Sequence, residues 1–216
     1  MDGNRRWARR NRLQLLLGHE NGVKRIEPVV EYAAKKGIQY LTFWAFSTEN
    51  WKRSEEEVSV LLDVFRKALS GSMMDRLKEN GVRVQVVGDI ISFPDDIQKK
   101  VFSIVDGTKD NTKITANFAL NYGGRDEILR AVNSLIEDNV REVTEDLFSR
   151  YLYTKGQPDP DLIIRTGGEQ RLSGFLPWQS IYSELYFTRT LWPDFSAKEF
   201  AEALGEYKQR ERRFGK

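Results

Sequence analysis

The sequence lacks cysteine and lacks any long apolar run. Without cysteine there can be no disulfide, no thiolate metal site and no cysteine nucleophile. No apolar run approaches the roughly 20 residues that span a bilayer, and the arginine-rich start has no apolar segment typical of a signal peptide. These absences predict a cytoplasmic protein that could touch a membrane but does not cross one.

The usual nucleotide-binding motifs are also missing. The sequence contains no G-x-x-x-x-G-K-[ST] phosphate-binding loop, and the NYGGR segment at 121–125 is not a dinucleotide fingerprint. A phosphate-bearing ligand of this chain therefore need not be a nucleotide.

The formal net charge is only +2, but positive charges gather at both ends of the sequence. Such clusters often bind anions, including phosphate esters, nucleic acid and lipid head groups. The alternative, and for any single cluster the better interpretation, is the solvated face of a helix. The clustered residues are Arg5, Arg6, Arg9, Arg10 and Arg12 at the start and Lys208, Arg210, Arg212, Arg213 and Lys216 at the end.

Apolar residues switch repeatedly between a period of 2 and a period of 3.6, which predicts strands alternating with helices. This alternation is typical of a mostly parallel central sheet flanked by helices, here as one α/β domain over residues 1–216. Pro28 should kink the first helix or shift its start. The expected strands are 38–46, 82–87, 114–120 and 161–165, and the expected helices run from His19 to Lys36, from a Ser54 capping box to Gly81, onward from Pro94, over 126–137, and onward from a Ser196 capping box.

Three loops combine small residues or glycine with arginine. They are MDGNRRW at 1–7, STENWKR at 47–53 and RTGGEQRLSG at 165–174. The last two follow predicted strands, and ligands of open α/β sheets bind beyond the carboxyl ends of strands. Glycine lets backbone N–H groups approach an anion, and arginine forms bidentate bonds to phosphate oxygens. Each loop alone is a weak signal, but together they predict a phosphate or diphosphate ligand.

Three single residues are candidates for chemistry. His19 is the only histidine. A lone histidine is often a satisfied polar residue, but its position after Gly18 at a predicted helix start, where backbone donors favour an anion, makes a functional role about equally plausible. Asp2 and Glu184 are candidate Mg²⁺ ligands, because Mg²⁺ is typically bound by one or two carboxylates together with substrate phosphates and water. Glu184 lies in an aromatic stretch, where a carboxylate either pairs with an arginine or holds a metal.

An ordered set of segments resembles the cis-prenyltransferases, the undecaprenyl diphosphate synthase or isoprenyl transferase family. The segments follow the family's order and spacing and span nearly the whole chain, so the resemblance is highly specific. They are MDGNRRWA at 1–8, GH at 18–19, FWAFSTENWKRS at 43–54, NYGGRDEI at 121–128, LIIRTGGEQRLSGFLPWQ at 162–179, YSELYF at 182–187, LWPDF at 191–195 and RERRFG at 210–215.

The resemblance implies a homodimer with a hydrophobic tunnel that condenses an allylic diphosphate, such as farnesyl diphosphate, with isopentenyl diphosphate. Asp2 would be the central catalytic aspartate, acting with Mg²⁺ at the allylic diphosphate. Glu184 would help to hold the metal, from the same subunit or across the dimer. Asn50 would serve in proton removal or in positioning the second substrate. Peripheral contact with a membrane would accompany product release, and no nucleic acid is implied.

The remaining implied residues contact the two substrates. Such roles agree with the chemistry, because arginines and Mg²⁺ stabilise a diphosphate leaving group and a tunnel would bury the hydrocarbon tail. Periodicity cannot separate tunnel lining from ordinary core. The implied substrate-binding residues are Gly3, Asn4, Arg5, Arg6, Trp7 and His19 near the allylic diphosphate; Ser47, Thr48, Glu49, Trp51 and Arg53 around Asn50; and Arg165, Arg171, Leu172 and Ser173 near isopentenyl diphosphate.

Two features depart from the family pattern. Leu15 stands where the family usually has an arginine, four residues before His19, which removes one expected diphosphate contact. The family also carries an apolar strand ahead of MDGN, whereas this sequence starts at that Met. Because Asp2 should lie at the carboxyl end of a strand, we expect the natural protein to have several more residues, including this strand, upstream of Met1.

Two other functions fit parts of the sequence. A non-catalytic partner subunit of another prenyltransferase would be expected to lose the aspartate or the RTGGE-type loop, and this sequence has both. An RNA-binding module would explain the basic RRWARRNR segment with its single tryptophan. It would leave the carboxylates of Glu49, Glu169 and Glu184 unexplained, because they would repel a phosphate backbone.

Overall fold

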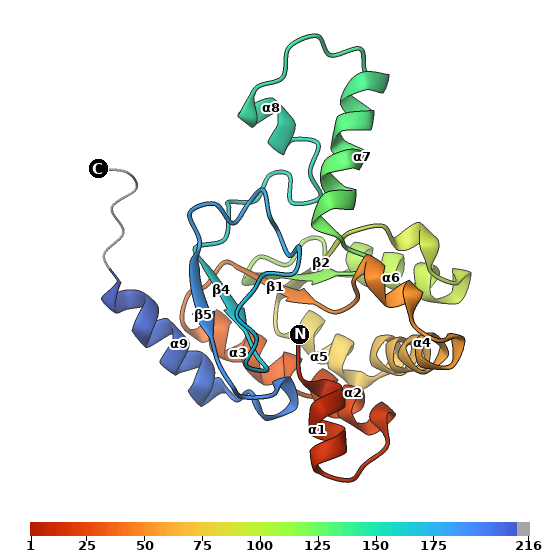
Figure 1. The fold of residues 1–216 in the computed structure, drawn as a ribbon, viewed down its shortest axis with the longest axis vertical. Helices are drawn as coiled ribbons and strands as arrows, with labels where there is room; N and C mark the ends of the chain where they lie inside the picture. Colours follow the sequence, from red (N-terminus) through yellow and green to blue (C-terminus); the bar gives the residue numbers. More distant parts are fainter. Residues whose placement is uncertain (211–216) are drawn as a thin grey trace.

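The computed structural model describes residues 1–210, and its strands form two parallel sheets (Figure 1). Strands β1 (Tyr40–Trp44), β3 (Ile114–Ala119) and β2 (Val82–Val87) form one sheet in that order, and β4 (Leu162–Arg165) pairs with β5 (Glu184–Phe187). Every pairing is parallel, which confirms the predicted α/β class. Most of the RERRFG segment and the last basic residues lie outside the described residues.

Within residues 1–210, no strand joins the two sheets. One edge of β1 pairs with β3 and one edge of β4 pairs with β5. Met1 and Asp2 lie between the other two edges, at the carboxyl ends of β1 and β4. The expected strand upstream of Met1 stays a prediction.

Helices surround the sheets and supply most of the remaining structure. No helix within residues 1–210 is long and apolar enough to cross a membrane. The helices are α1 (Asn4–Arg10), α2 (Leu15–Val23), α3 (Ile26–Lys35), α4 (Glu55–Ser70), α5 (Ser72–Glu79), α6 (Asp95–Gly107), α7 (Gly124–Glu137), α8 (Glu145–Ser149) and α9 (Ala197–Gln209), with the 3-10 helices η1 (Thr48–Lys52), η2 (Ile90–Ser92) and η3 (Trp192–Asp194).

Two predicted helices are each divided in two. The first is interrupted between α2 and α3, so that Pro28 lies in the first turn of α3; its ring would clash with the carbonyl four residues earlier if the helix were continuous. The second is interrupted at Gly71, whose ψ of 160° is extended rather than helical. Apolar spacing continues across both interruptions, so periodicity alone missed them.

The two predicted capping boxes differ in outcome. Ser196 and Glu199 form a complete box at the start of α9. At α4, Oγ of Ser54 accepts from the N–H of Glu57 at 3.3 Å, but the carboxylate of Glu57 forms an ion pair with Arg5 at 2.8 Å. A cation from a distant segment therefore holds the side chain that the local pattern assigned to a cap.

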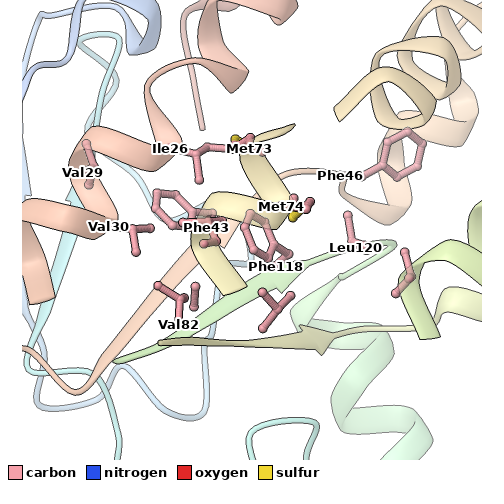
Figure 2. Close-up of a cluster of buried hydrophobic side chains, with 14 of the residues drawn as sticks. Ile26, Val29, Val30, Phe43, Phe46, Met73, Met74, Val82, Phe118 and Leu120 are labelled. Carbon is pink, nitrogen blue, oxygen red and sulfur yellow. The ribbon is translucent and has the colours of Figure 1, made fainter. Parts of the chain in front are cut away.

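One face of the three-stranded sheet forms the main apolar core. Phe43 and Phe118 stack there with ring centroids 5.6 Å apart, beneath Ile26 of α3 and Met73 and Met74 of α5 (Figure 2). Since neighbouring residues of a strand point to opposite faces, the other face carries a different set. It includes the buried Asn117, whose side chain donates to Thr42 at 3.1 Å and Gln157 at 2.6 Å.

Candidate active site

Asp2 lies between the carboxyl ends of β1 and β4. The N-terminal nitrogen of Met1 donates to the carbonyl of Trp44, the last residue of β1. The carbonyl of Asp2 accepts from Oγ1 of Thr166 at 2.7 Å and from the N–H of Trp192 at 3.1 Å. These bonds hold the backbone of Asp2 at the sheet edge where ligands of α/β proteins usually bind.

The Asp2 carboxylate is held by two arginines. Oδ1 accepts from Arg6 at 3.1 Å and Oδ2 accepts from Arg165 at 3.2 Å. Burial acts to raise the pKa of Asp2, but the hydrogen bonds and charges of Arg165 and Arg6 outweigh it and hold the pKa below its usual value. Asp2 is therefore ionised at neutral pH, as a Mg²⁺ ligand must be.

Residues 165–174, which we call the Gly-rich loop, carry cations that already have partners. Arg165 donates to Oγ of Ser173 at 2.8 Å and to the carbonyl of Arg171. Arg171 forms an ion pair with Glu169 at 2.6 Å. These contacts give the loop a fixed shape before any ligand binds. We call Arg165, Arg171 and Ser173 the arginine wall.

Glycine is required where Arg6 meets this loop. Gly167 has a φ of 91°, a conformation that residues with a side chain rarely adopt. Its carbonyl accepts from Arg6 at 2.5 Å, and a Cβ at this position would crowd the same guanidinium. Arg6 thus connects α1 to the Gly-rich loop while also binding Asp2.

His19 faces a second group of cations. Burial, followed by the positive charges of Arg53, the amino terminus and Arg5, lowers the pKa of His19 to about 4, so the imidazole is neutral at pH 7. The expected position at a helix start is wrong: α2 begins at Leu15, which makes His19 its fifth residue. Its contact with an anion would therefore come from the side chain rather than from the helix end.

Arg5 and Arg53 leave positive charge in excess beside His19. Arg5 is paired with Glu57. Burial and then the charge of Arg5 lower the pKa of Arg53, while Glu57 acts to raise it. Two guanidinium groups thus share one nearby carboxylate, and a bound anion would relieve their repulsion. We call Arg5, His19 and Arg53 the histidine wall.

Close packing of α1 on α2 leaves one buried acceptor unpaired. A Cβ at Gly18 would overlap the carbonyl oxygen of Asn4, and one at Gly22 would overlap Oδ1 of Asn4. This Oδ1 has no hydrogen-bond partner among residues 1–210. Because Asn4 also lines the cavity beside Asp2, its oxygen could accept from a ligand or from a water of a hydrated metal ion.

Residues 47–53, which we call the Asn50 loop, fold as η1 with a capping box of their own. Oδ1 of Asn50 accepts from the N–H of Ser47 at 3.0 Å, and the N–H of Asn50 donates to the carbonyl of Ser47 at 2.9 Å. The ring of Trp51 packs on Phe46 with centroids 4.8 Å apart. The loop is thus held by bonds between Ser47 and Asn50 and by the packing of Trp51 on the preceding Phe46.

A cavity of about 830 Å³ begins at these groups and continues into the core. Its inner wall is apolar and includes Val23, Ile26, Leu61, Met73 and Ile104, an arrangement consistent with the expected tunnel. The predicted residues that line it are Asp2, Asn4, His19, Ser47, Asn50, Arg53, Arg165, Arg171 and Leu172. Those that do not are Gly3, Arg5, Arg6, Trp7, Thr48, Glu49, Trp51, Ser173 and Glu184.

Trp7 anchors α1 instead of facing the cavity. Its Nε1 donates to Asp194 of η3 at 2.6 Å, and Arg10 pairs with the same carboxylate. These contacts indicate that Trp7 supports the position of α1, and with it Asp2.

Glu184 does not join Asp2 within one chain. It lies opposite Leu162 at the amino end of the β4–β5 pair, whereas Arg165, which binds Asp2, lies at the carboxyl end. Its carboxylate forms an ion pair with Arg210 at 2.7 Å, one of the two possibilities that the sequence left open. A role in metal binding stays a prediction and would have to come from a partner subunit.

The remaining residues fit a metal that the substrate helps to hold. Among residues 1–210, no three His, Asp or Glu side chains gather into a metal site. Mg²⁺ nevertheless needs only one or two carboxylates when phosphate oxygens and water complete its coordination. Asp2 is ionised and lines the cavity beside arginines, so it fits that kind of site.

Sequence reasoning missed three residues that position the site. Glu57 holds Arg5 but was assigned to a helix cap. Thr166 holds the backbone of Asp2. Asp126 accepts from Oγ1 of Thr48 at 2.8 Å and lies in the NYGGRDEI segment, which was matched without any role. That match was the one signal that could have identified Asp126.

Comparison with known proteins supports one family. The profile of the family described as undecaprenyl diphosphate synthase matches residues 1–215. The isoprenyl transferase of Clostridium perfringens is 48% identical, over 100% of this chain and 87% of its own. That of Thermotoga maritima is 46% identical, over 100% and 94% of the two chains.

Two solved structures share the fold. The crystal structure of lavandulyl diphosphate synthase from Lavandula x intermedia in complex with dimethylallyl diphosphate has a TM-score of 0.94 and 31% identity, covering 100% of this chain and 95% of that one. The structure of a probable undecaprenyl diphosphate synthase from Campylobacter jejuni has a TM-score of 0.83 and 35% identity, covering 91% and 92%.

Proposed function

The chain belongs to the undecaprenyl diphosphate synthase family and is a cis-prenyltransferase, and we propose that it uses Mg²⁺ to condense an allylic diphosphate, such as farnesyl diphosphate, with isopentenyl diphosphate. One observation carries this proposal. Ionised Asp2 lies between two cationic walls at the polar end of an apolar cavity. Two diphosphates and one hydrocarbon tail are the ligands that this arrangement suits.

The allylic diphosphate binds at the histidine wall. His19 and Arg53 line the cavity there, and their surplus of positive charge needs an anion. The buried, unpaired Oδ1 of Asn4 lines the same cavity and would accept from a water of the hydrated metal ion rather than from the diphosphate itself. The hydrocarbon tail enters the apolar part of the cavity, where each buried CH₂ contributes about 0.8 kcal/mol.

Isopentenyl diphosphate binds at the arginine wall. Arg165 and Arg171 line the cavity and are held by Ser173 and Glu169. Because these side chains are already ordered, little rotamer freedom is lost when the diphosphate binds. The wall contacts Asp2 through Arg165, and Asp2 lines the same cavity as His19 and Arg53, which supports one carboxylate serving both diphosphates.

The reaction breaks the allylic C–O bond, forms a carbon–carbon bond to isopentenyl diphosphate and releases a proton and a diphosphate. Arginines aimed at the leaving diphosphate stabilise the charge that develops on it. Asp2 would hold Mg²⁺, with Asn4 bonded to a water of the hydrated ion, and the metal would supply further neutralisation of that diphosphate when bound. Asn50, which lines the cavity, serves in proton removal or in positioning the second substrate.

A homodimer is part of the proposal. Leu129 and Ile136 on α7 are 62% and 67% exposed, and α7 with α8 projects away from the sheets (Figure 1). An exposed apolar row on a projecting helix supports burial against a second copy. In such a dimer Glu184 of the partner subunit would approach the metal. A cytoplasmic location and membrane contact during product release stay predictions.

One experiment tests the reaction directly. Purified protein is incubated with Mg²⁺, farnesyl diphosphate and labelled isopentenyl diphosphate, and the products are sized; a parallel sample contains EDTA. We expect chains longer than farnesyl only with the metal. No elongation in the presence of Mg²⁺, or equal elongation with EDTA, would contradict the proposal. If the protein instead shifted the electrophoretic mobility of RNA in a salt-dependent way and showed no prenyl transfer, the RNA-binding alternative would be favoured.

A further inference from the structure

The segment 121–127, at the start of α7, contacts the Asn50 loop through both backbone and side chains. The N–H of Thr48 donates to the carbonyl of Tyr122 at 3.2 Å. Oγ1 of Thr48 donates to Oδ2 of Asp126 at 2.8 Å. Nε1 of Trp51 donates to Oδ1 of Asn121 at 2.8 Å. Three bonds thus join a loop that carries a proposed catalytic residue to one helix start.

The same segment contacts the far side of the Gly-rich loop. The N–H of Gly124 donates to the carbonyl of Gly174 at 3.0 Å. A Cβ at Gly124 would overlap this carbonyl and the ring of Pro177, so only glycine allows the two backbones to approach so closely. The ring of Tyr122 also packs edge-on against Phe175.

A buried carboxylate anchors the segment between the two loops. Glu127 is 1% exposed. Its Oε2 accepts from the hydroxyl of Tyr122 at 2.6 Å and from Gln179 at 3.2 Å, and its Oε1 accepts from the N–H of Tyr153 at 2.8 Å. Because Tyr122 lies in the segment itself and the other two partners lie elsewhere in the chain, Glu127 fixes where α7 begins relative to Tyr153 and Gln179.

We propose that residues 121–127 are a positioning hub for the reaction, with Asp126 holding Thr48 and thereby the Asn50 loop at a set distance from the arginine wall. This inference rests on the proposed function, because that function places both Asn50 and the arginine wall at isopentenyl diphosphate. None of residues 121–127 lines the cavity, so the hub acts through the loops. Asp126 is a positioning residue.

The bond between Asp126 and Thr48 is the part of the hub that can be cut without disturbing the core. Asp126 is exposed, so its loss creates no buried cavity. Asp126→Ala removes the acceptor, Thr48→Val removes the donor, and Asp126→Asn keeps an acceptor oxygen of the same shape. Asp126 also stabilises the first turn of α7 as an acidic residue. Asp95→Ala in the first turn of α6 is the matched control for that effect.

The test is steady-state kinetics with each substrate varied in turn, together with the urea midpoint of every variant. We expect Asp126→Ala to lower kcat and raise the KM for isopentenyl diphosphate by a combined factor of about ten, equivalent to about 1.4 kcal/mol. The KM for the allylic substrate should rise less than that for isopentenyl diphosphate, because Arg53 lies at the opposite end of the Asn50 loop from Thr48. Asp126→Asn should recover most of the loss, and Asp95→Ala should change the urea midpoint without changing either KM.

A double-mutant cycle separates positioning from simple stability. If the bond positions the loop, the Asp126→Ala/Thr48→Val double variant should be no worse than the worse single variant. The inference would be overturned if the losses of kcat/KM in the two single variants multiplied in the double variant. It would also be overturned if the single variants lost kcat/KM equally for both substrates. If Asp126→Ala fails to fold, Thr48→Val and Asp126→Asn carry the test, because both leave α7 intact. Failure of the proposed function is distinct, since wild-type protein would then show no turnover at all.

Discussion

The two walls that flank Asp2 differ in how their charges are paired. On the arginine wall, Arg165 is paired with Asp2 and Arg171 with Glu169. On the histidine wall, Arg5 and Arg53 lie near a single carboxylate, that of Glu57. A wall whose arginines are paired is ordered before the ligand binds, but some of its ion pairs must break when it binds an anion. The wall with surplus positive charge therefore gains the most electrostatic free energy from a bound anion.

Under the proposed function, this difference in charge pairing is how two similar substrates would be distinguished. Both proposed substrates carry a diphosphate, so charge alone cannot separate them. The histidine wall continues into the apolar cavity through Val23 and Ile26, which favours the substrate with the longer hydrocarbon tail. The arginine wall offers ordered donors to the shorter substrate. Asp2 is bound by the arginine wall through Arg165 and lines the same cavity as His19 and Arg53 of the histidine wall.

Replacing Asp2 with alanine should have the largest effect, because the proposed reaction places both diphosphates and the metal at this carboxylate. We expect Asp2→Ala to lose almost all turnover while its urea midpoint stays close to that of the wild type, since Asp2 is a polar loop residue with no apolar packing to lose. Both quantities are measured on the same preparation with saturating Mg²⁺. A variant that retained more than about a tenth of kcat, a loss under ~1.4 kcal/mol, would contradict the catalytic assignment.

Removing one arginine from each wall should separate the substrates. We expect Arg53→Ala to weaken binding of the allylic diphosphate, and Arg171→Ala to weaken binding of isopentenyl diphosphate. Each loss of binding free energy should be about 1.5–3 kcal/mol, the range for a hydrogen bond to a charged group. Each Kd is measured by calorimetry with the other substrate absent.

The second half of that test is the unaffected substrate in each variant. Its Kd should change less than threefold. The same loss for both substrates in both variants would mean that the walls bind one shared anion and that the comparison between them is wrong.

The pH dependence of stability should report on the histidine wall. The pKa of His19 is about 4 in the folded protein, against an ordinary value of 6.5 that the unfolded chain should show. Between those values the unfolded chain binds a proton that the folded chain does not, so stability falls as pH decreases from about 6.5 to 4. Because His19 stays partly accessible to solvent, we expect a loss of roughly 1–3 kcal/mol.

This loss is measured as the urea midpoint between pH 7 and pH 5 for wild type and His19→Gln. The variant should lose less stability than the wild type over that range. Inorganic pyrophosphate should also reduce the wild-type loss, because a bound anion favours protonated His19. An identical pH dependence in both proteins would show that His19 does not carry it.

Most of the fold followed from local patterns, but the site required contacts between distant segments. The strands at 82–87 and 114–120 were predicted almost to the residue, because periodicity and glycine stops are local. Pro28 was predicted to kink the first helix or shift its start, and α3 does begin at Ile26. The break at Gly71 was missed, and so was β5, whose aromatic stretch showed no strand pattern of its own. The pairing of Glu57 with Arg5 spans 52 positions, and no spacing rule indicates it.

The candidate residues were identified chiefly through the family resemblance, and the structure sorts them by location. One cavity is lined by Asp2, His19, Arg53 and Arg165. This agrees with the prediction that the ligand site lies beyond the carboxyl ends of the strands. Glu184 does not, because the sequence cannot reveal that it lies at the opposite end of the β4–β5 pair. Which residues line a cavity and which support it from behind depends on side-chain direction in the folded chain.

The smallest effect is expected from Leu15→Arg, which would restore an arginine to the histidine wall. Leu15 begins α2 and does not line the cavity, but it lies one turn before His19 and therefore on the same side of the helix. A flexible arginine there could extend toward the allylic diphosphate, although Arg5 and Arg53 already supply positive charge. We expect the allylic Kd to fall by only a few fold. The corresponding gain in binding free energy is well below the 1.5–3 kcal/mol of a full charged hydrogen bond. Calorimetry at low and high salt measures this change, and a gain from electrostatic attraction should shrink as salt is added. Leu15→Lys is the matched control, because it adds the charge without the bidentate geometry of arginine. If Leu15→Arg binds the allylic diphosphate no better than wild type does, Arg5 and Arg53 already supply the positive charge that this diphosphate can use.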